Sequence, residues 1–249
     1  MAFIEIRVPQ KFTNPEGLLR IPDVTTGLKV DLSADTLTGA EGSTVTQWQS
    51  SGSAPALLDR VVDSSTTLPT LTLDGPDGGR AVKFTGGQSI STGPGYIAAE
   101  EGQPATVVVV FRNDATDINQ RILGVDVGGS SYRYLRVTRY QGVQAYSSTA
   151  TAGGQQFSIQ GILTTGEWVI AAVTYGESET TLRVFGKGTS SSPMALGAMT
   201  GLALGASPVG VEPMTGLIAR VLIYDRPLGD FDADAIMSLL AKEYGIGGD

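Results

Sequence analysis

The chain has 249 residues, of which 41% are hydrophobic and 17% charged, a balance that permits one large core and excludes intrinsic disorder. Its formal net charge of −8 disfavours binding to nucleic acid and to anionic membrane surfaces, because both depend on Lys and Arg. It contains neither cysteine nor histidine, which excludes disulfides, thiolate catalysis, Ser-His-Asp catalysis and most transition-metal sites.

The first segment of the chain, residues 1–26, differs from the rest. Alternating apolar residues from Phe3 to Val8 predict a short strand that stops at Pro9 and continues as an extended arm. This arm is either an extra edge strand on the domain or an attachment segment for a partner. The segment lacks the basic and apolar regions of a signal peptide, so we expect cytoplasmic synthesis of a whole gene product that begins at Met1. No apolar run in the chain is long enough for a membrane span.

From Leu28 onward, alternating apolar and polar residues predict a series of short β-strands. The alternation is clear in Leu28–Leu32, and a dense turn cluster at Asp74–Gly79 separates two later strands. The run Thr106–Phe111 is apolar after its first residue, which predicts a central strand covered on both faces. About twelve to fourteen strands are expected, and Gly216–Tyr224 is the last of them.

The end of the chain departs from the strand pattern. Apolar residues at helical spacing follow Asp230, Asp232 and Asp234, whose carboxylates favour the amino end of a helix. Gly245 is expected to end this helix. The sequence therefore predicts an all-β domain over residues 27–249, closed by one short C-terminal helix and without internal repeats.

Six stretches of the chain carry motifs that recur together in one family of domains. They are Gly27–Asp35, Val45–Gly52, Gly79–Gly87, Gly166–Gly176, Met214–Leu228 and Leu240–Ile246. In this order they resemble laminin-G-like, concanavalin A-like domains over residues 27–246. The resemblance implies a jelly-roll sandwich of two curved antiparallel sheets, each with six or seven strands. Domains of this family are common in bacteriophage structural proteins.

Several residues in these stretches have physical roles that do not depend on the family. Trp48 and Trp168 are the only tryptophans, and strand residues flank both, so we predict that both anchor the core. Phe84 is expected to point inward at the end of its strand. Gly216 permits a close approach to a neighbouring backbone, and Pro227 prevents further pairing after the last strand.

The acidic groups of the chain do not suggest catalysis. Glycoside cleavage requires two carboxylates on one face, whereas Glu100–Glu101 and Glu177–Glu179 fall in predicted turns. The aspartates of Asp230–Asp234 lack the glycine and glutamate of a calcium loop and are better explained by helix capping. Asp126 is the least unfavourable candidate for a calcium ligand. We predict no enzymatic activity, no bound metal and no cofactor.

Two glycine-rich stretches also lack the pattern of a nucleotide site. Gly75–Gly79 and Gly153–Gly154 contain no phosphate-binding motif, and no helix is predicted after either one. Both are interpreted as turns.

The segment Tyr132–Tyr140 is the strand with the clearest functional pattern. Alternation places three tyrosines and an arginine on one face, where they could stack on sugar rings and hydrogen-bond to hydroxyls. The alternative is that these side chains only cover a sheet. The candidate ligand-binding residues are Tyr132, Tyr134, Arg136 and Tyr140, with Tyr146 from the next strand.

Three classes of function remain. The favoured one is a non-catalytic bacteriophage virion protein of the tail, baseplate or head decoration. Its expected partners are other virion proteins, host-surface glycan and further copies of itself, without nucleic acid or membrane. A cysteine-free β-sandwich with an N-terminal arm motivates this hypothesis. The alternatives are a cell-surface or secreted carbohydrate-binding module and, least favoured, a glycoside hydrolase.

Overall fold

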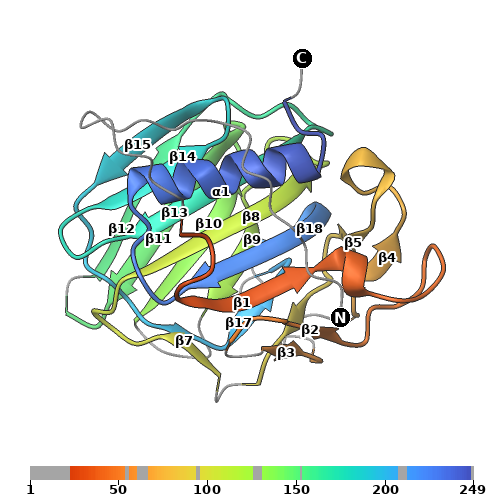
Figure 1. Cartoon of the computed structure of the whole chain (residues 1–249), viewed down its shortest axis with the longest axis horizontal. Helices are drawn as coiled ribbons and strands as arrows, with labels where there is room; N and C mark the ends of the chain where they lie inside the picture. Colours follow the sequence, from red (N-terminus) through yellow and green to blue (C-terminus); the bar gives the residue numbers. More distant parts are fainter. Residues whose placement is uncertain are drawn as a thin grey trace.

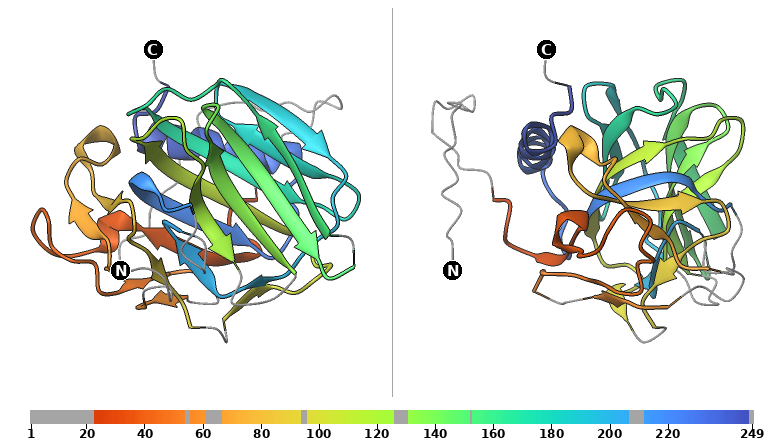
Figure 2. Two further views of the ribbon diagram at one scale, coloured as in Figure 1. Left: turned by 180° about the vertical axis from the view of Figure 1, so that it is seen from behind. Right: turned by 90° about the vertical axis from the view of Figure 1, so that its right-hand side faces the viewer.

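The fold is a β-sandwich of two antiparallel sheets with one helix packed on its outer side (Figures 1 and 2). The structure, a computed structural model, describes residues 23–53, 56–60, 67–93, 96–125, 131–151, 153–206 and 212–247. The predicted all-β class with a C-terminal helix is confirmed. Among the described residues, no helix is long and apolar enough to cross a membrane.

The larger sheet has eight strands. Its order is β15 (Gly188–Ser192), β14 (Thr180–Val184), β13 (Trp168–Tyr175), β8 (Ala105–Asn113), β18 (Thr215–Tyr224), β5 (Ala81–Thr85) and β4 (Thr70–Thr72), and β1 (Leu28–Ser33) pairs with the later half of β18. The sheet is therefore wider than the six or seven strands expected.

The smaller sheet has six strands and forms the opposite layer. Its order is β12 (Gly153–Ile159), β11 (Gly142–Thr149), β10 (Tyr132–Thr138), β9 (Gln120–Val125), β17 (Leu202–Leu204) and β6 (Ile90–Ser91). Two short ribbons and two 3₁₀ turns complete the described fold: β2 (Trp48–Gln49) with β3 (Leu57–Leu58), β16 (Met199–Thr200) with β7 (Ile97–Ala99), η1 (Ala34–Thr36) and η2 (Pro76–Gly78).

The apolar run of β8 is explained by its position between two hydrophobic cores. Val107, Val109 and Phe111 belong to the core between the two sheets, whereas Val108 and Val110 belong to the core beneath α1 (Asp230–Glu243). Because alternate residues of a strand point to opposite faces, only a continuous apolar run satisfies both cores. The prediction of a strand covered on both faces is confirmed.

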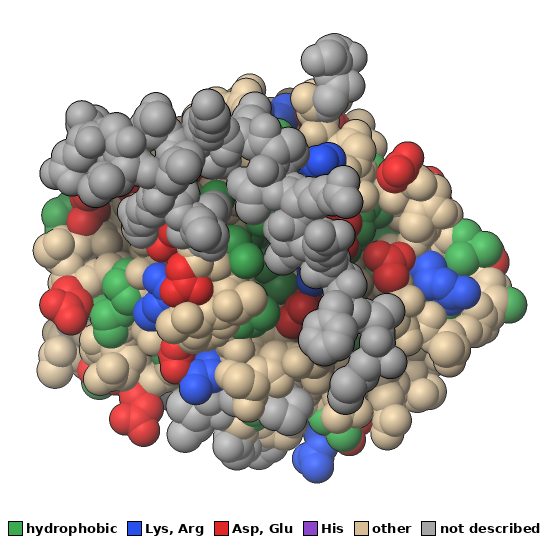
Figure 3. Space-filling model, viewed as in Figure 1, with side chains coloured by type: hydrophobic (Ala, Val, Ile, Leu, Met, Phe, Trp, Pro, Cys, Tyr) green, Lys and Arg blue, Asp and Glu red, His purple; other side chains and the backbone are tan. Residues whose placement is uncertain are grey.

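The helix α1 begins and ends where the sequence predicts. Gly229 is its N-cap, and Gly245 adopts φ +61° just after its end, a conformation that glycine accepts readily. Near the amino end, the buried Arg183 of β14 forms ion pairs with Asp230 and Asp234. These aspartates therefore fix the helix to the sheet. On the face that carries α1, acidic and basic side chains are interspersed (Figure 3).

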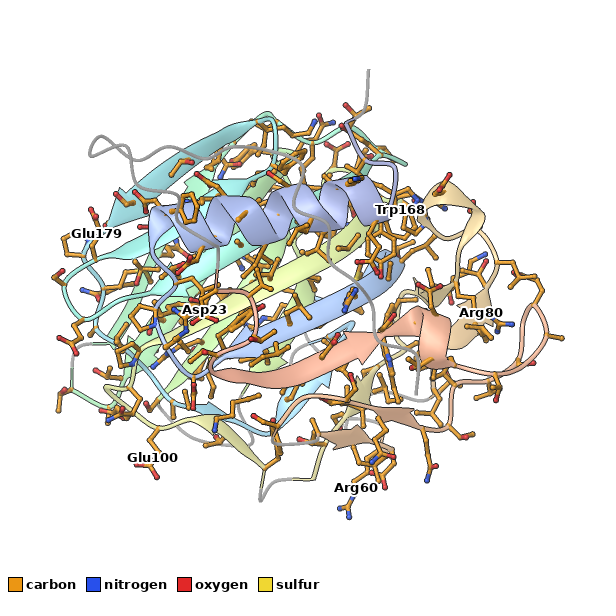
Figure 4. All side chains as sticks on the ribbon, in the orientation of Figure 1. Asp23, Arg60, Arg80, Glu100, Trp168 and Glu179 are labelled. Atoms are coloured by element: carbon orange, nitrogen blue, oxygen red, sulfur yellow. The ribbon has the colours of Figure 1, made fainter. Side chains whose placement is uncertain are left out.

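The segment that precedes β1 is bound by residues at the end of β18 and just after it. Arg226 donates hydrogen bonds to the backbone oxygens of Asp23 and Thr26, both at 2.9 Å. The hydroxyl of Tyr224 donates to the backbone oxygen of Val24 at 3.0 Å. Asp23 lies toward the amino end of α1 (Figure 4). The rest of the predicted arm, residues 1–22, lies outside the described residues.

The predictions for individual core residues are mostly confirmed. Trp48 and Phe84 are fully buried, and a Cβ on Gly216 would lie 2.2 Å from the backbone oxygen of Arg112. The prediction for Trp168 needs correction, because its side chain is half-buried and packs against the core beneath α1, not between the sheets. Gly153 and Gly154 are also corrected, since they begin strand β12 and do not form a turn.

Arg220 joins three elements through its guanidinium. It donates to both carboxylate oxygens of Asp31 on β1, at 3.0 and 3.1 Å, and to Glu243 of α1 at 2.7 Å. Only 20% of the Arg220 side chain and 16% of that of Asp31 are exposed. Partial burial makes such a two-point, charge-assisted contact stronger than a pair on the open surface.

We expect Asp31→Asn to lower the free energy of unfolding by about 2 kcal/mol, because it leaves a partly buried guanidinium short of its counter-charge. Urea denaturation of the variant and the wild type measures this loss. Asp59→Asn is the matched control: its pair with Arg60 spans 3.6 Å with 65% of the Arg60 side chain exposed, so the same charge change should cost little. Equal losses in the two variants would contradict the prediction.

Candidate functional site

The candidate site lies on the outer face of the six-stranded sheet, on the side of the molecule away from α1 (Figure 2). The alternation of β10 places Leu135 and Val137 in the core between the sheets, and Tyr134 and Arg136 on the outer face. Tyr134 lies opposite Tyr146 of β11 and opposite Gly124 of β9. The pairing of β10 with its two neighbours thus assembles a row of side chains from several strands.

Three tyrosines of this row stack on one another. The rings of Tyr134 and Tyr146 are 4.3 Å apart and 6° from parallel, and those of Tyr132 and Tyr146 are 5.4 Å apart. The other neighbour of Tyr134 is Arg121 of β9, whose guanidinium carbon lies 4.1 Å from the ring centre. Since β9 and β11 flank β10 on opposite sides, both faces of the Tyr134 ring are covered. Burial raises the pKa of its hydroxyl to about 12.

A cluster of charged and amide groups adjoins the tyrosine row. Glu212 accepts hydrogen bonds from Nε of Arg121, at 2.9 Å, and from Nη1 of Arg136. The backbone oxygen of Glu212 also accepts from the backbone N–H of Arg121 at 2.8 Å. Nε of Arg136 donates to Oε1 of Gln144 at 2.5 Å. Two guanidiniums therefore share one carboxylate, which leaves a local excess of positive charge among the described residues, in a chain of net charge −8.

A tyrosine of the other sheet supports the row from within the core. The hydroxyl of Tyr175, on β13, lies 3.3 Å from the backbone oxygens of both Tyr134 and Tyr146. Tyr175 is fully buried and its ring contacts the guanidinium of Arg133 at 4.9 Å. These contacts join the two sheets directly beneath the candidate site, so they hold β10 and β11 in place.

The structure brings four of the five predicted site residues together. They are Tyr132, Tyr134, Arg136 and Tyr146. Tyr140 is not part of this cluster: β10 ends at Thr138, and the following turn places Tyr140 beside Arg139 with 60% of its side chain exposed. Alternation along the strand predicted the face correctly but not the end of the strand, which the turn at Gln141 (φ +54°) determines.

Sequence reasoning missed Arg121, Gln144 and Glu212. Gln144 had a detectable signal, because it alternates with Tyr146 on β11 and pairs directly with Arg136. Arg121 is harder to find because a register irregularity in the pairing of β9 and β10 brings it opposite Arg136. Glu212 has no periodic signal, since it precedes β18 in a loop and adopts a left-handed conformation with φ +59°.

Two pockets lie near α1. A pocket of about 510 Å³ is lined by Trp168, Phe185 and Tyr244 and by the ion-paired Lys187 and Glu167. Trp168 lies near the carboxyl end of α1 (Figure 4). A smaller pocket, of about 370 Å³, lies beside the buried Arg183 near the amino end of the helix. Neither pocket carries the convergence of aromatic, cationic and amide groups found on the outer face of the six-stranded sheet.

No metal centre is found in the described part of the chain, where no three acidic side chains come together as a metal site requires. Asp126, the candidate calcium ligand, lies outside the described residues. Glu100 and Glu179 are exposed in turns, as the sequence predicts (Figure 4).

A family model described as the concanavalin A-like lectin/glucanases superfamily, Laminin_G_3, matches residues 84–232. No curated protein matches the chain in sequence.

Several solved structures resemble the fold. Domain 4 of AbnA, a GH43 extracellular arabinanase from Geobacillus stearothermophilus in complex with arabinotriose, is 15% identical with a TM-score of 0.60, over 86% of this chain and 99% of that one. The receptor binding domain of botulinum neurotoxin D is 10% identical with a TM-score of 0.62, over 86% of this chain and 53% of that one.

The CBM40 of a Ruminococcus gnavus sialidase, bound to α2,3-sialyllactose, is 17% identical with a TM-score of 0.50, over 63% of this chain and 95% of that one. The chain spans about half the length of the botulinum neurotoxin D chains that it matches. At these identities the likeness concerns the fold.

Proposed function

Because the chain belongs to the concanavalin A-like lectin/glucanases superfamily, we propose that it is a non-catalytic glycan-binding protein. The observation that carries this proposal is the outer face of the six-stranded sheet, where stacked tyrosines adjoin two arginines and a glutamine. Such a surface offers many hydrogen-bond donors and acceptors on a rigid aromatic support, which suits a ligand covered with hydroxyls.

The contacts of Tyr134 determine how a sugar would be recognised on this face. Since Tyr146 and Arg121 cover both faces of the Tyr134 ring, a sugar ring does not lie flat on Tyr134. The row instead offers the hydroxyls of Tyr132 and Tyr146, which lie 3.4 Å apart on half-buried side chains. Next to Tyr134, recognition therefore rests on hydrogen bonds from these hydroxyls and from the arginines, and not on stacking.

The ligands of two structural neighbours support a sugar as the ligand class. The arabinanase domain holds arabinotriose, and the sialidase module holds α2,3-sialyllactose. Both are oligosaccharides bound by proteins of the same overall fold. A glycan array is the direct test: binding to no glycan would sink the proposal.

The absence of catalysis is supported by the chemistry of the site. Retaining and inverting glycosidases use two carboxyl groups across the scissile bond. The described cluster around the tyrosine row has one carboxylate, Glu212, and two guanidiniums hold it. We expect no release of reducing ends from any polysaccharide that the protein binds, and hydrolysis by the purified protein would contradict this part of the proposal.

We expect Tyr132→Phe and Tyr146→Phe each to weaken glycan binding about three- to tenfold, because each removes one hydroxyl while the ring stays in the stack. Titration calorimetry with the best glycan from the array measures the change. Glu177→Gln, in the exposed connection between β13 and β14, is a matched surface control. Unchanged affinity in both tyrosine variants would show that the row is structural.

The setting that we propose is a bacteriophage particle, in which the protein either recognises a host-surface glycan or decorates the virion. Cysteine-free composition and the resemblance to domains common in phage structural proteins support this setting. Immunogold labelling of purified virions, together with a pulldown of virion proteins, tests it. Glycan binding without any association with virions would favour a bacterial surface or secreted binding module.

A further inference from the structure

Arg121, Arg136, Gln144 and Glu212 form a cation cluster on the outer face of the six-stranded sheet. This cluster has more hydrogen-bond donors than acceptors. Arg121 uses Nε for Glu212, and Arg136 uses Nε for Gln144 and Nη1 for Glu212. Within the described part of the chain, both terminal nitrogens of Arg121 and Nη2 of Arg136 have no hydrogen-bond acceptor. None of these nitrogens is among the buried polar atoms that lack a partner. The Arg121 side chain is 15% exposed and the Arg136 side chain is 14% exposed. They are therefore available to a ligand from the solvent side.

Contact with Tyr134 fixes how the guanidiniums are presented. Their central carbons lie 4.1 Å (Arg121) and 5.5 Å (Arg136) from the centre of the same tyrosine ring. A guanidinium held over an aromatic ring keeps its N–H groups in its own plane, free to form paired hydrogen bonds with a planar anion. Carboxylate is the planar anion that best matches this fork.

Glu212 already occupies part of this position. Its carboxylate bridges the two arginines, and its backbone adopts φ +59°, a left-handed conformation that is uncommon for glutamate. Release of the side chain from the arginines would cost two ion pairs, which a ligand carboxylate on the same guanidiniums would replace. The Glu212 carboxylate thus occupies the position that the carboxylate of a ligand would take.

We propose that Arg121 and Arg136 bind the carboxylate of an acidic sugar, and that Glu212 is the internal counter-ion that this carboxylate joins or displaces. The inference rests on the proposed glycan binding and specifies the class of sugar. The two guanidiniums carry two positive charges and Glu212 carries one negative charge, so one further anion would balance the charge of the cluster. The net charge of −8 repels polyanions elsewhere on the molecule, so acidic glycans would bind at this cluster and not over the whole surface.

The test compares each acidic oligosaccharide with its own methyl ester, which keeps the sugar and removes the charge. The probes are tetragalacturonate and a glucuronate tetrasaccharide, each beside its ester, and a sulfated tetrasaccharide. For at least one carboxylate we expect binding at least tenfold tighter than that of its ester. Equal affinity for acid and ester would overturn the inference and leave the proposed function standing, whereas a glycan array with no binding would remove both. Preference for the sulfated probe alone would also overturn it.

Variants of the cluster give an independent answer. Arg136→Gln should reduce affinity for the acid to that for the ester, and Arg136→Lys should retain part of the preference because it keeps the charge but not the fork. Glu212→Gln, which is nearly isosteric, should strengthen acid binding several-fold and leave ester binding unchanged. Near-UV circular dichroism of each variant shows whether it is folded. Loss of acid binding in a folded Glu212→Gln variant would show that Glu212 only organises the arginines, and would overturn its role as a substitute anion.

Discussion

Gly205→Ala should destabilise the protein by about 4 kcal/mol, because the added methyl group meets two obstacles at once. Gly205 adopts φ +82°, which costs an L-residue about 1 to 2 kcal/mol. A Cβ there would also lie 2.1 Å from Cδ1 of Phe84, which is fully buried between the sheets. The ring cannot move aside without disturbing the core, and overpacking of this kind adds about 1 to 3 kcal/mol.

Gly166→Ala isolates the contribution of the backbone. Gly166 has nearly the same conformation, φ +80°, but a Cβ there would have no atom within 4 Å. We expect it to cost about 1 to 2 kcal/mol from the backbone alone. Thermal denaturation should separate the pair by roughly 5 to 10 °C for a domain of this size. Equal melting temperatures would show that the core around Phe84 adapts to the extra methyl group.

Arg133→Met is expected to lower stability by about 2 kcal/mol, although it removes a buried charge. Arg133 lies on the core side of β10 and is fully buried, and it donates to the backbone oxygens of Gly197 and Gln103, both at 2.5 Å. Methionine fills a similar volume but leaves both oxygens without a donor, at about 1 to 3 kcal/mol each. Relief of the buried charge offsets part of this loss. Arg133 contacts the aromatic ring of Tyr175 and forms no ion pair with a described carboxylate.

The direction of the pKa shift of Arg133 shows that burial of its charge destabilises the native state. Burial lowers this pKa to about 10, so between pH 10 and the higher pKa of the unfolded chain the native state binds fewer protons than the unfolded chain. Stability from this group therefore rises with pH across that window, and at neutral pH the full cost of burying the charge is present.

Urea denaturation at neutral pH measures the balance between these effects. Arg133→Ala should be less stable than Arg133→Met by about 2 kcal/mol or more, because it also leaves a cavity. A methionine variant as stable as the wild type would show that the two backbone oxygens find other donors.

Much of the fold was predictable because apolar patterning reports burial directly. The run Thr106–Phe111 predicted β8 and its two covered faces, and the spacing after Asp230 predicted α1. The strands β12 and β15 were missed because they are edge strands rich in Gly, Ser and Gln. At an edge, backbone pairing on one side maintains a strand without an apolar pattern.

The candidate site was only partly predictable for a related reason. Alternation along one strand identified Tyr132, Tyr134 and Arg136, but it carries no information about which strand lies alongside. The partners Arg121 and Glu212 enter through the sheet order and a loop conformation, both of which are properties of the tertiary structure. For the same reason the sequence did not indicate that both ring faces of Tyr134 are covered and that the residue is only 4% exposed.

The stacked tyrosines also make the outer face of the six-stranded sheet an optical reporter of its own occupancy. Three of the eight tyrosines are packed there, whereas Trp48 is buried between the sheets and Trp168 lies near the carboxyl end of α1. Rings held a few ångströms apart in a fixed, asymmetric environment contribute to the near-ultraviolet circular dichroism of a folded protein. A ligand that shifts this row would change the tyrosine bands while leaving tryptophan emission nearly constant, so occupancy of this face becomes measurable on the unlabelled protein.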